Sequence, residues 1–208
     1  TDVWKENISF ADRHNEPGKF TAMIGYEWTA MINGNNLHRV IVYRDNADKA
    51  GQLPPFSALD SQDPEKLWAF LEEYETKTGG DIMAIPHNGN ISNGMMFQLN
   101  TVSGEPVSEA WAQTRIKWEP LYDVTQVKGD GEAHPFLSPD DEFADYENWD
   151  EDNIGRTVTK KNKMLQYEYG RSALKLGLKV EQELGTNPYE FGLLGSTDSH
   201  TTLSTADD

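Results

Sequence analysis

An aspartate and a histidine two residues apart, Asp198 and His200, follow the apolar run 191–194 near the end of the chain. We expect both on the turn that leaves a short buried strand, where the carboxylate and the imidazole can face one cavity. A buried aspartate and a buried histidine need partners, and a divalent cation is a common one. The pair therefore predicts a metal-binding or catalytic site. The competing interpretation is a turn aspartate that caps backbone amides beside a surface histidine.

Three upstream residues of the same chemical kinds, Glu27, His38 and His87, also lie at the ends of expected strands. His87 leaves the apolar run 82–86 and precedes Asn-Gly-Asn, so the backbone there can bend into a site. Glu27 could bridge two cations if its side chain points into a cleft among the histidines. Each residue also has a purely structural interpretation: a hydrogen-bonded loop histidine for His87, a strand glutamate on the solvated face for Glu27, and a half-exposed strand histidine for His38.

A further loop, after the expected strand 121–127, contains Lys128, Glu132 and His134. If that strand belongs to the same sheet, the loop reaches the same face as the candidate ligands. Lys128 could hold an anionic group as a point charge. These three residues are therefore candidates for contacts with a substrate.

The elements that must position these residues alternate between strand and helix. Asp63 suits the N-cap and Pro64 the first position of a helix that ends at Gly79-Gly80. Such alternation favours an α/β protein with a mainly parallel sheet or barrel, in which ligands gather at the carboxyl ends of the strands. The strands are expected at 20–28, 37–43, 82–86, 121–127 and 191–194, and the helices at 63–78, 109–118 and about 164–184.

Composition limits the classes of function. The 208 residues suit a single domain, 1–208, and 37% hydrophobic with 25% charged residues is a globular mixture. The net charge of −17 argues against a nucleic acid or an anionic membrane as partner. Because the chain has no cysteine, any metal must be held by histidine, aspartate and glutamate. No apolar run is long enough for a membrane span or a signal peptide.

Residues 130–152 contain ten acidic side chains and no lysine or arginine. A run of this kind is usually a solvated surface segment. The aromatic residues within it nevertheless suggest that it packs down as a long ordered excursion over about 129–160. These residues are Phe136, Phe143, Tyr146 and Trp149.

Four short motifs, at 25–29, 36–39, 85–88 and 195–201, resemble the PHP (polymerase and histidinol phosphatase) superfamily of metallohydrolases, and within it a bacterial branch of unknown function. The resemblance implies an incomplete distorted (β/α)7 barrel with mainly parallel strands, flanking helices and a site for two or three metal ions. It implies that Glu27 bridges two ions and that His38 and His87 complete one of these sites. Asp198 would bind the other bridged ion, and His200 a third. Zinc, manganese or iron suits such ligands better than calcium.

The chain departs from the PHP pattern in one respect. The His-x-His of the first strand, and an aspartate and a histidine shortly after it, would precede Thr1. The resemblance therefore implies the later part of a barrel, whose open edge could pair with a second copy to give a homodimer. The cytoplasm and the periplasm are equally compatible with the sequence.

The expected function is a metal-dependent hydrolase that acts on a phosphoester substrate, with His87, Asp198 and His200 as catalytic residues. Bridging cations would lower the pKa of a bound water and stabilise the charge on phosphorus, and a nearby histidine or aspartate could move the proton. One alternative is a degenerate, non-catalytic barrel that serves as an interaction or structural domain. Another is a carbohydrate-binding module, which would need exposed coplanar rings among the six tryptophans.

Overall fold

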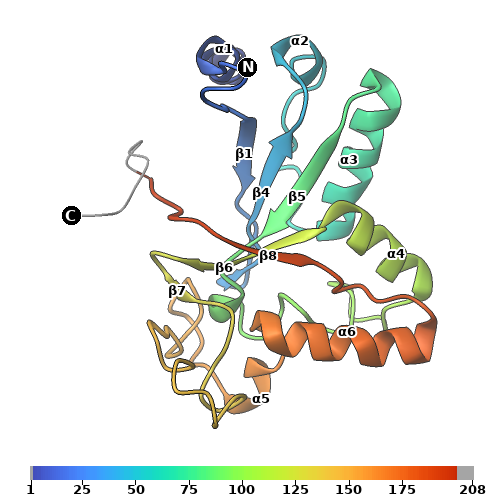
Figure 1. Ribbon diagram of the computed structural model, residues 1–208. Helices are drawn as coiled ribbons and strands as arrows, with labels where there is room; N and C mark the ends of the chain where they lie inside the picture. The colour runs from blue at the N-terminus through green and yellow to red at the C-terminus, as the bar shows by residue number, and fades with distance from the viewer. Residues whose placement is uncertain (1, 201–208) are drawn as a thin grey trace.

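The strands of the protein form three small sheets, as the computed structural model of residues 2–200 shows (Figure 1). Thr1 and residues 201–208 are not described, so Thr201 of the last motif lies outside the described residues. The first sheet has the order β1-β4-β5 and comprises β1 (Ile24–Trp28), β4 (Arg39–Tyr43) and β5 (Ile82–Pro86). A small hairpin consists of β2 (Met31–Ile32) and β3 (Asn35–Asn36). The third sheet has the order β7-β6-β8 and comprises β7 (Gly129–Asp130), β6 (Leu121–Gln126) and β8 (Gly192–Gly195).

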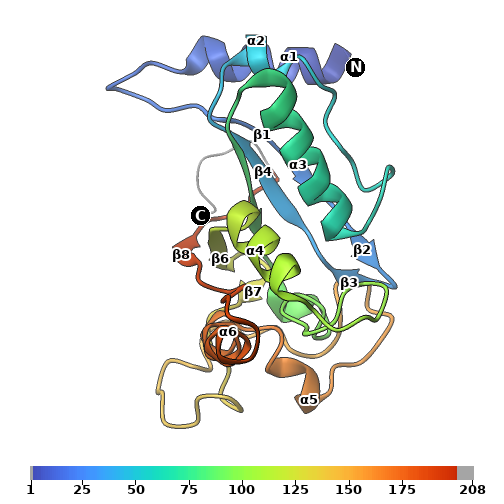
Figure 2. The ribbon, with the colours of Figure 1, turned by 90° about the vertical axis from the view of Figure 1, so that its right-hand side faces the viewer.

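The helices leave one face of the first sheet uncovered. In Figure 2, α3 lies in front of β1 and β4, whereas α6 lies below the sheets; both α3 and α4 contact β5. The bounds are α1 (Asp2–His14), α2 (Ala47–Ala50), α3 (Pro64–Thr78), the 3-10 turn η1 (Gly89–Ile91), α4 (Glu109–Trp118), α5 (Asn162–Leu165) and α6 (Gly170–Leu184). Within the described residues, none of these helices is long and apolar enough to cross a membrane.

Local helix signals in the sequence are mostly confirmed. The Asp63 side chain accepts a hydrogen bond from the amide of Glu65, and Gly79 ends α3 with a φ of 61°, a conformation that glycine adopts without strain. The helix expected over 164–184 is instead two helices, α5 and α6, separated by residues 166–169. In that break, Tyr169 packs with 0% of its surface exposed, so tertiary packing overrides the helical periodicity.

The expected barrel of mainly parallel strands is wrong. β4 is antiparallel to both β1 and β5, and among the described residues the parallel pairings are β6 with β8 and a single bridge between His87 and Asp123. Only residues 29–38 separate β1 from β4, and parallel neighbours need a crossover of about a dozen residues or more. The protein is a mixed α/β structure of small, mostly antiparallel sheets, and no sheet closes within residues 2–200. β1 pairs only with β4 in this part of the chain, and pairing of its free edge with a second copy stays a prediction.

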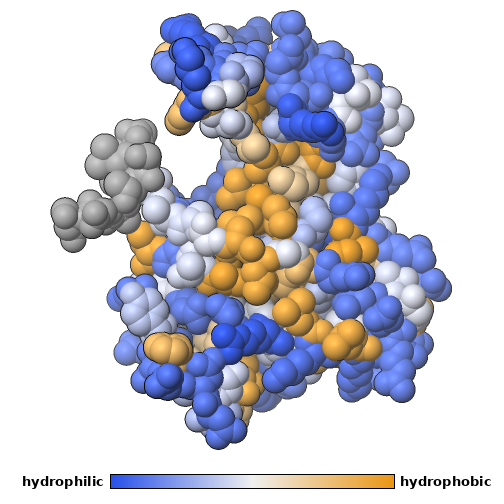
Figure 3. Space-filling view, viewed as in Figure 1, coloured by the Kyte–Doolittle hydropathy of each residue, from blue (hydrophilic) through white to orange (hydrophobic). Residues whose placement is uncertain are grey.

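Two hydrophobic cores lie on the covered faces of the sheets. The first joins α1, α3 and the covered face of the first sheet, where Ile41 and Tyr43 are at most 1% exposed. The second packs α6 under β6 through Tyr122 and Ala173. Alternate residues of β4, Val40 and Val42, are only half-buried on the opposite face. Figure 3 shows apolar surface across the middle of the molecule, over these strands.

The tryptophans do not form an exposed platform of the kind that a carbohydrate-binding module would use. Four of them are at most 5% exposed, namely Trp4, Trp28, Trp68 and Trp118. Trp111 is half-buried and packs edge-on against Trp68 at a centroid distance of 5.4 Å. Trp149 is also half-buried. A flat sugar-stacking surface made of tryptophans is therefore not present among the described residues.

The acidic excursion has little regular secondary structure and only part of it packs down. Phe136, Phe143 and Tyr146 are each more than half exposed, so the expectation that they pack down is wrong for these three. The excursion is held instead by polar contacts. Asn153, which is 0% exposed, donates from Nδ2 to the Asn35 side chain at 2.8 Å and accepts at Oδ1 from the Thr157 amide at 2.9 Å.

Replacing Asn153 by alanine is expected to release the excursion from the β2–β3 hairpin. The substitution removes the side-chain hydrogen bonds of Asn153 to Asn35 and Thr157, and the loss of hydrogen bonds at a buried residue costs about 1–3 kcal/mol of stability. Amide hydrogen exchange should then accelerate at residues 33–36 and 153–158, while Glu142→Gln on the exposed part of the excursion should leave it unchanged. Unchanged exchange in the Asn153→Ala variant would contradict this anchoring role.

Candidate metal centre

Three strands of the first sheet bring Glu27, His38 and His87 to one edge. Glu27 pairs with Val40 across β1 and β4, while Arg39 pairs with Pro86 across β4 and β5. The end of β1, the start of β4 and the end of β5 therefore meet. The amide of His87 donates to the carbonyl oxygen of His38 at 3.4 Å, which holds the two histidine backbones together.

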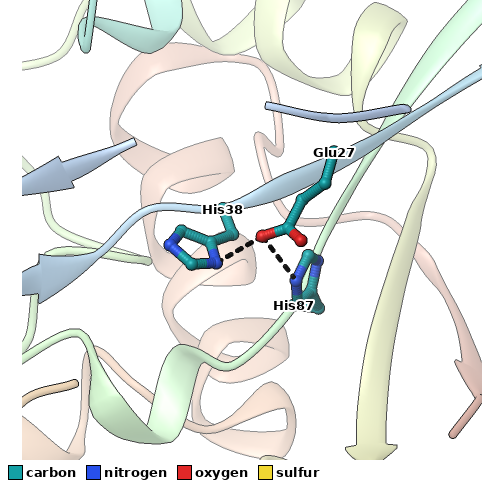
Figure 4. Close-up of side chains that lie close together, drawn as sticks. All are labelled: Glu27, His38 and His87. Atoms are coloured by element: carbon teal, nitrogen blue, oxygen red, sulfur yellow. Dashed lines mark ion pairs between the residues drawn. The ribbon is translucent and has the colours of Figure 1, made fainter. Parts of the chain in front are cut away.

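The three side chains converge around one carboxylate oxygen (Figure 4). Oε1 of Glu27 lies 2.5 Å from Nδ1 of His38 and 3.8 Å from Nε2 of His87. The two imidazole rings are 5.8 Å apart and inclined at 70°. One ligand atom from each residue fits within 4.8 Å of the others, a spacing at which a single cation could contact all three.

Most of the histidine nitrogens of this cluster are buried without a hydrogen-bond partner among the described residues. His38 is 5% exposed and His87 1%. Three of their four ring nitrogens have no hydrogen-bond partner among the described residues, and the fourth, Nδ1 of His38, lies in ion-pair contact with Glu27. Buried polar atoms are normally paired because leaving them unpaired costs free energy. Coordination of a metal ion would pair one nitrogen of each ring, so these residues fit a metal.

The protonation states of the cluster also suit a cation. Burial lowers the pKa of His87 to about 4, so its ring is neutral near pH 7 and carries a free lone pair. Burial would raise the pKa of Glu27, but the rings of His38 and then His87 outweigh it and hold this pKa below its ordinary value. A carboxylate beside a neutral imidazole is the arrangement that binds a divalent ion.

Asp198 and His200 form a second group with the same Glu27. Nε2 of His200 lies 3.3 Å from Oδ1 of Asp198, whose other oxygen pairs with the Lys128 ammonium. Burial would raise the pKa of Asp198, but Lys128 holds it below its ordinary value. The Asp198 side chain is 12% exposed, whereas that of His200 is 67% exposed. Glu27 is therefore shared by a buried group and a more open one.

The three predicted substrate residues are placed differently. Lys128 reaches the site through its ion pair with Asp198. Glu132 instead accepts from Arg171 Nε at 2.8 Å, and His134 Nε2 lies 2.8 Å from an oxygen of Asp150. Neither belongs to the two ligand groups, and a substrate contact for them stays a prediction.

Two further polar residues at the site, Asp123 and Asn88, were not identified from the sequence. Asp123 lies in β6, and its backbone forms a parallel β-bridge with His87. Its carboxylate accepts from the Ser196 hydroxyl at 2.5 Å, and burial raises the pKa of this carboxyl group. Asn88 adopts a φ of 56° and its amide lies 3.5 Å from Asp198. An aspartate inside the apolar strand 121–127 was the available signal, since a buried acid there requires a partner.

Comparison with known proteins corrects the expected family. The family model of a protein of unknown function (DUF3604) matches residues 1–208. No curated protein and no solved structure matches the chain. The resemblance to the PHP superfamily is wrong, because its motifs are short sets of ligand-type residues that recur in unrelated metal sites, and the sheets do not form its barrel. The chain belongs to the DUF3604 family of proteins of unknown function.

Proposed function

We propose that Glu27, His38 and His87 bind a divalent metal ion and that the protein is a metal-dependent hydrolase of phosphoester bonds. The observation that carries this proposal is the convergence of two buried imidazoles on one carboxylate, with three of the four ring nitrogens lacking a hydrogen-bond partner among the described residues. A purely structural role would leave the His87 ring with an unpaired donor, since a neutral imidazole always has one N–H and its nearest carboxylate oxygen is 3.8 Å away.

The ligand set favours a catalytic over a purely structural ion. Two imidazoles and one carboxylate suit zinc, manganese or iron. Structural zinc sites are almost always closed by four protein ligands, whereas catalytic sites keep a position for water. Asp198 and His200 would extend the site to a second ion that shares Glu27.

The side chains near the centre fit hydrolysis of a phosphoester. A bound divalent ion would lower the pKa of a water and stabilise charge on the phosphorus. Lys128 contacts Asp198 and so places a positive charge beside the second ligand group, where it could bind a phosphate oxygen. His200 is exposed on the other side of Asp198 and could pass a proton to solvent. The net charge of −17 does not oppose an anionic substrate here, because bound cations dominate the local field.

Metal loading tests this proposal. After dialysis against a chelator, the protein should bind zinc or manganese with a stoichiometry of one or two, measured by calorimetry and elemental analysis. The loaded protein should hydrolyse p-nitrophenyl phosphate or bis(p-nitrophenyl) phosphate, and the chelator should stop it. Absence of binding at concentrations up to about 1 mM, a free energy of roughly −4 kcal/mol, would refute the metal centre. Binding without hydrolysis of either ester would favour the non-catalytic alternative.

A further inference from the structure

The second ligand group, Glu27, Asp198 and His200, lies beside a positive charge that the protein itself supplies. One oxygen of Glu27 and one of Asp198 lie within 4.8 Å of each other, and ionised carboxylates this close repel each other. The Lys128 ammonium forms an ion pair with Asp198, and among the described residues Asp198 is the only carboxylate in ion-pair contact with it. The ammonium is therefore the counter-charge of this group.

The backbone of Lys128 is fixed, whereas its side chain can rotate. The Lys128 amide donates to Oε1 of Gln126 at 2.6 Å, and its carbonyl oxygen accepts from Nδ2 of Asn90 at 3.1 Å. Gln126 is 6% exposed and Asn90 0%, so both anchors belong to the packed interior. The Lys128 side chain itself is 23% exposed, and its four-carbon stem has rotatable bonds. Rotation about these bonds alone can carry the ammonium away from Asp198.

The ammonium and a second metal ion would compete for the same carboxylate. Oδ2 of Asp198 holds the Lys128 ammonium, and Oδ1 lies 3.3 Å from Nε2 of His200. A divalent ion bound by Glu27, Asp198 and His200 would contact an Asp198 oxygen directly. Two cations on one partly buried carboxylate repel each other strongly, because solvent screens them less than at the surface.

We propose that Lys128 is an exchangeable counter-ion of the second ligand group. Its ammonium neutralises Asp198 in the metal-free protein and leaves Asp198 when a second divalent ion binds. The inference rests on the proposed function and deepens it, because it states how occupancy of the second site is controlled. The released ammonium stays tethered beside the ions, where the proposed function uses it to bind a phosphate oxygen. The second ion should therefore bind more weakly than the first, which has no such competitor.

Calorimetry with manganese tests the exchange without any substrate. Chelator-treated wild-type protein should bind one ion and then a second, weaker one. Lys128→Met removes the charge and keeps a long side chain, so it should tighten the second event at least about 10-fold. Lys128→Arg keeps the charge and should bind the second ion as weakly as the wild type. The matched control is Lys179→Met on α6, whose exposed ammonium lies 3.9 Å from Glu183, and it should change neither event.

Two further measurements assign the second event. His200 belongs to the second group and not to the first, so His200→Ala should abolish the weaker event in the wild type and the tightened event in Lys128→Met. Release of the ammonium is followed in the wild-type protein, so that no variant has to fold. Lysines are acetylated with sulfo-NHS acetate and read by mass spectrometry. Labelling of Lys128 should rise several-fold as the second equivalent of manganese is added, while labelling of Lys179 stays constant.

The outcomes separate this inference from the proposed function. An unchanged or weaker second event in Lys128→Met overturns the exchange, and so does constant labelling of Lys128. Binding of a single ion by both the wild type and Lys128→Met also overturns it, but leaves the first metal centre standing. A tighter second event in a protein that hydrolyses neither nitrophenyl ester upholds the exchange and refutes only the proposed hydrolase. Absence of any bound ion refutes both.

Discussion

Glu27→Gln is expected to reduce metal-dependent phosphoester hydrolysis by at least about 100-fold. Glu27 is the one acid shared by the two ligand groups, and glutamine keeps its shape while removing its charge. Loss of residues that only support metal ligands already costs about 10–100-fold in metal affinity or activity, so loss of a shared ligand should cost more. The readouts are kcat/KM for p-nitrophenyl phosphate and the metal stoichiometry by calorimetry.

Histidine variants separate ligation from general effects of the substitution. His87→Ala should lose both binding and activity, because its ring is 1% exposed and lies 3.8 Å from the shared oxygen. His14→Ala is the matched control, since His14 lies exposed on α1 with its Nδ1 2.9 Å from the Phe10 carbonyl oxygen of the same helix. Full activity in Glu27→Gln with an unchanged metal content would show that the centre lies elsewhere.

The local structure was largely predictable, whereas the assembly of the sheets was not. The capping signals at Asp63 and Gly79 act within a single turn, so the sequence contains all the information that they need. The short connection 29–38 favours an antiparallel pair of β1 and β4, but the pairing of β4 with β5 joins strands that residues 44–81 separate. Runs of buried apolar residues look the same in parallel and antiparallel strands, so alternation of strand and helix suggested a barrel that does not form.

The candidate ligands were predictable because their chemistry is restricted. Because the chain has no cysteine, its five histidines are the main candidates for nitrogen ligands of a metal. His38 lies at the start of one apolar strand, and His87 directly follows another. The supporting contacts were less accessible to sequence reasoning. The loop after β6 turns Lys128 towards Asp198 but leaves Glu132 facing Arg171, because the direction of a loop side chain has no periodicity.

Glu119→Gln is expected to destabilise the protein by about 3–5 kcal/mol, the largest effect on folding among these predictions. Glu119 is 1% exposed and follows α4. Its Oε1 accepts from Arg39 at 3.0 Å and from the Trp68 indole at 2.9 Å, and its Oε2 lies 3.1 Å from Arg115. Removal of the carboxylate charge leaves two guanidinium groups buried together without a counter-charge. Urea denaturation at pH 7 measures the loss.

The pH dependence provides a second readout for the same network. Burial would raise the pKa of Glu119, but Arg39 and then Arg115 outweigh it and hold this pKa below its ordinary value. The folded state therefore binds this proton less readily than the unfolded state. The stabilisation is complete above the unfolded pKa of about 4.3 and is lost as the pH falls through the lower folded value. Wild-type stability should thus decline more steeply on acidification than that of the variant.

A matched control distinguishes the network from a general effect of removing an acid. Glu72→Gln changes an exposed α3 residue, whose carboxylate lies 4.0 Å from Lys117, and it should alter stability by less than about 0.5 kcal/mol. A loss below about 1 kcal/mol in Glu119→Gln would show that water reaches the guanidinium groups.

Because Arg39 directly follows His38, loss of the network should also disturb the backbone that presents this ligand. Weaker metal binding by the folded variant would then link the buried ion pairs to the metal centre.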